Sequence, residues 1–320
     1  MKVELIDLKK RYQDERDHLL KCFDNVLKNG SLIMTDEVSN FENKVCEYTG
    51  AKFCLGLNSG TDALMMALWS LGIKKDDEII TSPLSFVASV GAIVHVGAKT
   101  VFVDVKDDLN INEDLIEASI TEKTKAIMPV HWSGKVCNMN KVIELAKKYN
   151  LFVIEDSAQG MGSYYNNQHA GTFGDISAFS AHPLKNLNAV GDSGFTVTNN
   201  EDLYNKIKLF RNHGMESRDN VKIFGVNSRL DSLNAEILSF RLSRLKEVVS
   251  KRRNNIELYR KYIKTDKVIL PKDSSNSFDS YVMMISLCEN RDDLQSYLNS
   301  KDIQSLVYYG TPLHLHKASS

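Results

Sequence analysis

One lysine stands inside a segment of small and apolar residues, where a lysine can do covalent chemistry. The segment reads Ala178-Phe179-Ser180-Ala181-His182-Pro183-Leu184-Lys185-Asn186-Leu187. Burial lowers the pKa of an amine and makes it a usable nucleophile toward an aldehyde. A lysine considered alone is most often a solvated surface charge. Lys185 therefore becomes informative only together with the groups that accompany it.

Two adjacent carboxylates follow a short apolar stretch earlier in the chain. Glu155 and Asp156 come directly after Val153 and Ile154. A carboxylate at the end of a buried strand can bind a metal ion, a ribose or a protonated ring nitrogen. It can equally cap the helix that follows it. The residues alone leave these interpretations open.

A third polar element is the turn Ser59-Gly60-Thr61, which lies between an apolar stretch and a helical pattern. Small residues let backbone N–H groups approach an anion, and the start of a helix carries a partial positive charge. The turn could therefore bind a phosphate group, although most turns of this kind only cap a helix. No GK[ST] sequence follows, so the turn is not a Walker loop.

Alternating strand and helix patterns must position these three elements. The predicted strands are short apolar runs at residues 53–57, 78–81, 100–105, 125–130, 151–155, 176–180 and 195–198. Helical patterns are found at residues 12–29, 61–68, from 86 onward, 112–120 and 139–149. This alternation predicts an α/β fold with a mainly parallel central sheet covered by helices. Such sheets bind ligands at the carboxyl ends of their strands.

The pattern changes after residue 228. Apolar residues then recur every three to five positions in a long charged helix, at Leu230, Leu233, Ile237, Phe240 and Leu245. We expect residues 1–228 to form an N-terminal arm and a large domain, and residues 229–320 to form a smaller α+β domain. In the smaller domain we predict strands at 281–287 and 303–307 and a helix at 291–300.

Composition argues against several classes of protein. The 40 basic and 41 acidic side chains give a formal net charge of −1, so nucleic acid and membrane surfaces are not expected partners. Five scattered cysteines without a CxxC pair indicate neither a disulfide framework nor a zinc site. His314 and His316 alone do not make a metal site. With no signal-peptide pattern and no apolar run of membrane length, we expect a cytoplasmic location.

Several longer strings resemble the DegT/StrS-type nucleotide-sugar aminotransferases, which have the fold type I aminotransferase architecture. The most specific is GTFGDISAFSAHPLKNLNAVGDSGFTVTN. Others occur in the order typical of the family: NSGTDALMMAL, SPLSFVASVGAIVHVGAKTVFVDV, PVHWSG, LFVIEDSAQGMGS and GVNSRLDSLNAEIL. The resemblance covers nearly the whole chain. It implies pyridoxal 5′-phosphate as cofactor, with pyridoxamine phosphate formed during turnover, and no metal.

The resemblance assigns a role to each matching residue. Lys185 would join the cofactor covalently, and Asp156 would pair with the protonated pyridine nitrogen. The cofactor would be held further by Gly60, Thr61 and Ser180 at the phosphate, Phe86 on the ring face and Gln159 at the phenolic oxygen. Asn227 would reach the phosphate of a neighbouring subunit, which implies a homodimer with shared active sites.

The family performs transamination of a nucleotide-linked keto sugar, with L-glutamate as the amino donor expected here. Most relatives have GEGG where this chain has Gly191-Asp192-Ser193-Gly194. That turn, with the KNL and NSRLD strings, resembles the subgroup that aminates C3 of dTDP-linked 3-keto-6-deoxyhexoses. Amination at C4 is the alternative within the family.

Three other functions are alternatives to sugar transamination. Relatives that dehydrate sugars have His in place of the lysine, and Lys185 argues against that reaction. A Rossmann-type nucleotide binder would carry GxGxxG, which does not occur. Relatives continue some tens of residues past PLHL, so we expect the small domain to be incomplete. A homologue that binds the cofactor without catalysis is therefore a further alternative.

Overall fold

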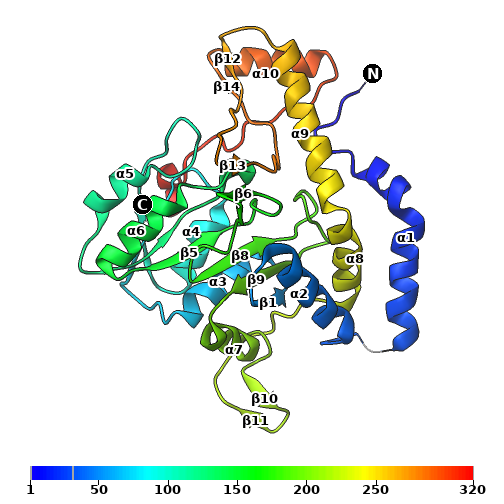
Figure 1. The fold of residues 1–320 in the computed structure, drawn as a ribbon, viewed down its shortest axis with the longest axis vertical. Coiled ribbons are helices and arrows are strands. Elements are labelled where there is room, and N and C mark those ends of the chain that lie inside the picture. The colour runs from blue at the N-terminus through cyan, green and yellow to red at the C-terminus, as the bar shows by residue number, and fades with distance from the viewer. Residues whose placement is uncertain (1, 31, 320) are drawn as a thin grey trace.

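A seven-stranded sheet lies at the centre of the chain in the computed structural model, which describes residues 2–30 and 32–319 (Figure 1). All neighbouring strands are parallel except β9, which runs antiparallel to both of its neighbours. The order across the sheet is β1 (Phe53–Leu57), β9 (Gly194–Thr198), β8 (Ile176–Ser180), β5 (Phe152–Asp156), β4 (Thr124–Met128), β2 (Glu78–Thr81) and β3 (Lys99–Phe102). The predicted α/β fold with a mainly parallel sheet is confirmed.

Helices cover both faces of the sheet, because successive strand residues point to opposite sides. Ile154 packs into the core on one face and Val153 into the core on the other. The first face is covered by α3 (Gly60–Ser70), α4 (Val87–His95) and α7 (Glu201–Phe210). The second face is covered by α2 (Asp36–Thr49), α5 (Glu113–Ile116), α6 (Met139–Tyr149) and α8 (Ser232–Ser243).

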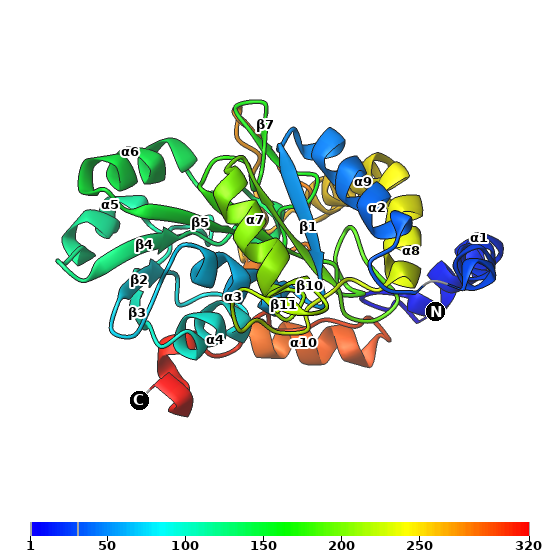
Figure 2. The same cartoon turned by 90° about the horizontal axis from the view of Figure 1, so that it is seen from below.

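Local sequence explains where several of these helices begin and end. α3 begins after Ser59, whose Oγ accepts a hydrogen bond of 3.0 Å from the N–H of Asp62. α1 (Leu8–Asn29) ends at Gly30, which adopts the left-handed conformation with φ 64°. α1 packs against α8 at one edge of the molecule (Figure 2). The predicted helix 12–29 is therefore confirmed and begins four residues earlier.

The remaining elements are the helices after α8, short strands and 3-10 turns. α9 (Leu245–Tyr262) follows α8 directly, and α10 (Arg291–Ser300) matches the predicted helix. The short strands are β6 (Tyr164–Tyr165), β7 (Gln168–His169), β10 (Met215–Ser217), β11 (Asn220–Val221), β12 (Val268–Ile269), β13 (Ser277–Phe278) and β14 (Leu287–Cys288). Single 3-10 turns are η1 (Glu117–Ser119), η2 (Trp132–Gly134), η3 (Leu313–Leu315) and η4 (Lys317–Ser319).

The two strands predicted at 281–287 and 303–307 are wrong. The N–H of Val282 donates to the carbonyl of Ser133, in the η2 turn, so this backbone pairs with a loop rather than a strand. Only Leu287 and Cys288 pair as a strand, with β12. Ile303 makes a single parallel bridge with Val3 near the other end of the chain.

Two further properties bear on function. Among the helices of residues 2–30 and 32–319, none is both long enough and apolar enough to cross a bilayer. The same residues contain no group of three or more His, Cys, Asp or Glu side chains that could hold a metal ion.

Candidate active site

Strands β1, β5 and β8 run in the same direction and end at one edge of the sheet. Asp156 is the last residue of β5 and lies beside Ala178 of β8, two residues before Ser180. β1 leads at this edge into the turn Ser59-Gly60-Thr61 and then into α3. The topology therefore brings the three polar elements of the sequence together.

The Ser59-Gly60-Thr61 turn and Ser180 lie against each other and form one small polar surface. A Cβ atom built on Gly60 would lie 2.7 Å from Cβ of Ser180, which is closer than such atoms approach in proteins. Glycine at position 60 therefore lets the start of α3 pack directly against Ser180. The first N–H groups of α3 lack partners inside the helix, and they begin at this surface. A phosphate group is the kind of ligand that such a helix start binds.

Gly194, the first residue of β9, lies directly under this turn. A Cβ atom at position 194 would lie 2.3 Å from the carbonyl carbon and oxygen of Ser59. The loop before it contains Gly191, whose φ of +111° suits only glycine. Close packing of the Gly194 backbone thus fixes the position of the Ser59-Gly60-Thr61 turn relative to β9.

Asp156 is buried, with 3% of its surface exposed. Its carboxylate accepts hydrogen bonds from Ser89 Oγ at 2.6 Å and from the N–H of Ala158 at 3.2 Å. Burial raises the pKa of Asp156, and the two hydrogen bonds and the charge of Lys185 oppose that rise. A partly compensated buried carboxylate of this kind is suited to receive a cationic group.

Lys185 lies in the loop between β8 and β9 and is half-buried. Burial lowers the pKa of its amine, and the negative charge of Asp156 acts in the opposite direction. The two side chains are thus close enough to influence each other across the carboxyl edge of the sheet. An amine with a lowered pKa is a better nucleophile at neutral pH than an exposed lysine.

Gln159 and Phe86 border the same region. Gln159 is buried, and its Oε1 accepts a hydrogen bond of 3.0 Å from the N–H of Ser133. Phe86 caps the start of α4 with 53% of its surface exposed, and its ring centroid lies 5.9 Å from that of Tyr309. An exposed aromatic ring at this edge offers a flat surface for another ring.

Asn227 lies next to the Ser59-Gly60-Thr61 turn. Its side chain is exposed, and its backbone carbonyl accepts a hydrogen bond of 2.9 Å from Nδ2 of Asn58. Asn58 is the residue between β1 and Ser59. Asn227 is therefore next to the turn of its own chain, and this contact uses its backbone carbonyl rather than its side-chain amide.

Sequence reasoning missed Ser89 and Tyr309. Ser89 is a small polar residue in the apolar run of α4, three positions after Phe86, and this interruption was the available signal. Tyr309 comes from the last part of the chain, and the charge of Asp156 acts on its hydroxyl. The segment that carries it lies beside α4 (Figure 2), where the N–H of Leu313 donates to the carbonyl of Pro83 at 2.8 Å. No local sequence pattern predicts the contact of this segment with the residues before α4.

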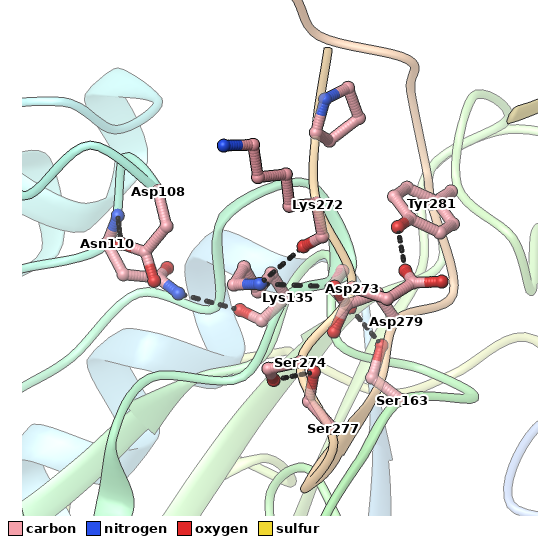
Figure 3. Close-up of polar contacts among 12 residues, drawn as sticks. Asp108, Asn110, Lys135, Ser163, Lys272, Asp273, Ser274, Ser277, Asp279 and Tyr281 are labelled. Atoms are coloured by element: carbon pink, nitrogen blue, oxygen red, sulfur yellow. Dashed lines mark hydrogen bonds and ion pairs between the residues drawn. The ribbon is translucent and has the colours of Figure 1, made fainter. Parts of the chain in front are cut away.

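A strap of residues 271–283 ties the C-terminal region to the loops after β4 and β5. Figure 3 shows the amine of Lys135 between the carbonyl of Lys272 at 3.1 Å and the carboxylate of Asp279 at 3.5 Å. Ser163 Oγ bonds to the hydroxyl of Ser280 at 2.8 Å. Next to Lys185, Asn186 donates from Nδ2 to the carbonyl of Ser280 at 3.3 Å. The strap therefore touches the loop that carries the lysine.

These residues fit a flat, phosphorylated aldehyde with a basic ring nitrogen. The amine of Lys185 and the carboxylate of Asp156 supply a nucleophile and an anion within one buried region. The close approach of Gly60 to Ser180 places a hydroxyl group beside the start of a helix, where a phosphate is favoured. Pyridoxal phosphate has all three of the matching groups.

Comparison with known proteins gives the same assignment. The model of the DegT/DnrJ/EryC1/StrS aminotransferase family matches residues 13–320. A dTDP-3-amino-3,6-dideoxy-alpha-D-galactopyranose transaminase of Aneurinibacillus thermoaerophilus is 38% identical over 99% of this chain and 87% of its own length. A GDP-perosamine synthase of Escherichia coli O157:H7 is 36% identical over 94% of this chain and 82% of its own. A pleiotropic regulatory protein of Geobacillus stearothermophilus is 35% identical over 98% of this chain and 86% of its own length.

Solved structures agree with the sequence relatives. DesV of S. venezuelae, in complex with a ketimine intermediate, superposes with a TM-score of 0.95 at 32% identity, covering 99% of this chain and 86% of DesV. NtdA of Bacillus subtilis, with bound cofactor PMP, gives a TM-score of 0.88 at 30% identity, covering 99% and 74%. The chain therefore belongs to the DegT/DnrJ/EryC1/StrS family of pyridoxal-phosphate-dependent sugar aminotransferases.

Proposed function

We propose that this enzyme transfers the amino group of L-glutamate to C3 of a nucleotide-linked keto-deoxysugar, with a dTDP-linked 3-keto-6-deoxyhexose as the substrate class. The observation that carries the proposal is that the half-buried Lys185 follows β8, the strand next to β5, which ends in the buried carboxylate of Asp156. Among the relatives, one named for a dTDP-3-amino sugar is 38% identical over nearly the whole chain. The Gly191-Asp192-Ser193-Gly194 turn supports the same subgroup.

Bound pyridoxal phosphate supplies an aldehyde that takes up the amino group and a ring that accepts electrons during proton transfer. Lys185 would hold the cofactor through its amine, and that amine, when free, would act as the base that takes the proton from the Cα of the donor and as the acid that returns it. Asp156 keeps the ring nitrogen protonated with its fixed negative charge. Gly60, Thr61 and Ser180 would bind the phosphate, and Phe86 and Gln159 would hold the ring.

Removing Lys185 tests the chemistry. The Lys185→Ala variant should show no transfer of the ¹⁵N label from L-[¹⁵N]glutamate to any keto sugar. Borohydride treatment should attach the cofactor covalently to the parent protein at Lys185 and leave the variant unmodified. Lys147→Ala, at the exposed end of α6, is the matched control and should behave like the parent. Undiminished transfer by Lys185→Ala would refute the proposed role.

Amination at C4 is the second candidate, because relatives named for different sugars are similarly distant. The GDP-perosamine synthase is 36% identical and the dTDP-3-amino sugar transaminase 38% identical. Incubation of the enzyme and labelled glutamate with a dTDP-3-keto and a dTDP-4-keto sugar in parallel separates the two reactions. Carbon–nitrogen coupling in the NMR spectrum of the product identifies the aminated carbon.

A cofactor-binding protein without catalysis is a third candidate, supported by the relative named as a pleiotropic regulatory protein. The first half-reaction distinguishes it from an enzyme. The absorption band of the protein-bound cofactor should disappear when glutamate is added to an active transaminase. A band that persists with glutamate and other amino donors favours the binding protein.

We also propose a homodimer in which Asn227 serves the phosphate of the neighbouring subunit. Mixing Lys185→Ala with Asn227→Ala protein tests this, because subunit exchange would create one site that carries neither change. Recovered activity supports shared sites, and unrecovered activity in exchanged dimers contradicts them. We further propose a large cofactor-binding domain at 1–228 and a small domain from 229, with the arm and strap contacts joining them.

A further inference from the structure

The loop that carries Lys185 is closed on itself at its base. The N–H of Ala189 donates to the carbonyl of Ala181 at 2.7 Å, and the N–H of Ala181 donates to the carbonyl of Ser193 at 2.8 Å. Within the loop, the N–H of Lys185 donates to the carbonyl of His182 at 2.9 Å. A shift of this closed loop would carry the amine of Lys185 with it.

Asn188 lies inside the loop with 5% of its surface exposed. Its Nδ2 donates to the carbonyl of Lys185 at 2.9 Å and to that of Asn186 at 3.3 Å. Its Oδ1 accepts from Arg11 at 3.0 Å and from Arg241 at 2.7 Å. One amide group thus joins the backbone of the lysine to two cationic side chains.

The two arginines come from helices on the other side of the loop. Arg11 in α1 also donates to the carbonyl of Pro183 at 2.9 Å. Arg241 in α8 also donates to the carbonyls of Asn188 and Ala189, at 2.8 and 3.1 Å. Glu15 of α1 accepts from Arg241 at 2.8 Å and offsets part of the positive charge. The loop is therefore held from two helices at four of its carbonyl and amide oxygens.

Holding Arg11 and Arg241 on one acceptor brings two positive charges close together, which is unfavourable. Burial lowers the pKa of Arg11, and the positive charge of Arg241 lowers it further. The shared acceptor between them is Oδ1 of Asn188, whose Nδ2 faces the lysine. Because charged hydrogen bonds are stronger than neutral ones, the arginines fix the orientation of this amide.

We propose that Asn188 is a positioning residue, which Arg11 and Arg241 orient and which sets the place of the Lys185 amine relative to Asp156. The inference rests on the proposed function, in which Lys185 joins the cofactor. Displacement of a reacting group by about 1 Å can lower a rate by roughly 100-fold. The amide of Asn188 acts through the backbone of Lys185 and touches no reacting atom.

Asn188→Asp is the sharpest variant. It keeps an oxygen acceptor for both arginines and removes the N–H groups that hold Lys185 and Asn186. The apoprotein is mixed with pyridoxal phosphate, the covalent link is trapped with borohydride at timed intervals, and the modified lysine is identified by mass spectrometry. We expect capture at Lys185 to slow by about 10- to 100-fold. The melting temperature of the apoprotein and the KM for glutamate should stay close to those of the parent.

Arg11→Met and Arg16→Met form a matched pair on the same helix. Arg11 bonds to the lysine loop, whereas Arg16 is exposed and pairs with Asp17 at 3.3 Å. Arg11→Met loses the hydrogen bonds to Pro183 and Asn188 while Arg241 still bonds to Asn188, and it should slow capture about 3- to 10-fold. Arg16→Met should leave capture unchanged. This pair decides the question even if Asn188→Asp does not fold.

The outcomes separate the inference from the function on which it rests. Capture at Lys185 with parental rates in both Asn188→Asp and Arg11→Met overturns the positioning role and leaves the proposed function intact. Equal effects of Arg11→Met and Arg16→Met also overturn it. Trapping of the cofactor on a different lysine in the parent protein contradicts the proposed function itself.

Discussion

Ser89 Oγ lies 2.6 Å from Oδ2 of Asp156 and donates a hydrogen bond to it from the neighbouring helix α4. Both residues are almost fully buried. A second serine, Ser85, lies 2.6 Å from the hydroxyl of Ser89. The carboxylate at the end of β5 is thus stabilised by a hydroxyl group that follows Phe86 on the same helix.

Replacing Ser89 by Ala should shift the acid limb of the pH profile. The hydrogen bond favours the ionised form of Asp156, so its loss should raise the pKa of a carboxyl that burial has already raised. The acid limb of kcat/KM should move to higher pH by up to about one unit, since a hydrogen bond to a charged group is worth on the order of 1.5 kcal/mol. Ser70→Ala, another buried serine that bonds to the carbonyl of Ala67, is the control and should not move the limb.

Enlarging Gly60 should weaken cofactor binding. A methyl group at this position would lie 2.7 Å from Cβ of Ser180 and would push apart two of the elements proposed to bind the phosphate. Gly60→Ala should raise the dissociation constant for pyridoxal phosphate by at least about tenfold, equivalent to 1.4 kcal/mol. Fluorescence titration of the apoprotein measures it.

Gly91→Ala serves as the control for Gly60→Ala. Gly91 lies inside α4, and a Cβ atom there meets nothing within 4 Å. Alanine should therefore be neutral for binding and stabilise the helix by up to about 1 kcal/mol. Equal cofactor affinity in the two variants would contradict the assignment of the phosphate site.

Buried His169 should make the fold sensitive to acid. Burial lowers its pKa from 6.5 to about 4, with the charge of His131 acting in the same direction and Glu155 opposing. Its Nδ1 donates to the carbonyl of Ala170 and its Nε2 accepts from the N–H of Gly162 at 3.1 Å. The neutral ring therefore fits the folded state, and protonation does not.

The sign of the effect follows from proton binding. Because the unfolded chain binds this proton more readily than the folded one, stability is fully present above pH 6.5 and is lost as pH falls toward 4. The loss attributable to His169 is about 3 kcal/mol. Denaturant unfolding across this range should show a flatter pH dependence for His169→Gln. A parallel pH dependence in both proteins would rule out this contribution.

Phe179 should be among the residues most costly to truncate. Its ring stacks on Phe195 with centroids 4.8 Å apart, and both side chains are almost fully buried. Phe179→Ala should reduce the free energy of unfolding by about 3–5 kcal/mol. Tyr262→Ala, with 71% of its surface exposed at the end of α9, should change it by no more than about 0.5 kcal/mol.

The strands of the sheet were predictable because each is a short apolar run that can be recognised from its own residues. Runs such as Ile79-Ile80 and Val153-Ile154 are apolar on both faces, which is typical of strands covered by helices. The grouping of Asp156, Ser180 and the Ser59-Gly60-Thr61 turn followed from the rule for strand ends. Strand propensity failed at Tyr281–Leu287 because that backbone pairs with the η2 turn, and such partners are set by tertiary contacts.

The support of the site was not predictable from local patterns. Arg11 and Asn188 are 177 positions apart, and Asn186 and Ser280 are 94 apart. Each of these contacts depends on how α1 and the strap fold back onto the sheet. Ser89 was visible only as an interruption of an apolar helix, and nothing in its neighbourhood indicates the carboxylate 67 positions later.

The close packing of Gly194 against the Ser59-Gly60-Thr61 turn restricts how the segment 191–194 could be redesigned. The backbone of Ser59 excludes any side chain at Gly194, and Gly191 holds a conformation that other residues adopt only with strain. A combinatorial library across this four-residue segment would thus have two usable positions, Asp192 and Ser193. Efforts to retune selectivity there can concentrate their diversity on those two codons.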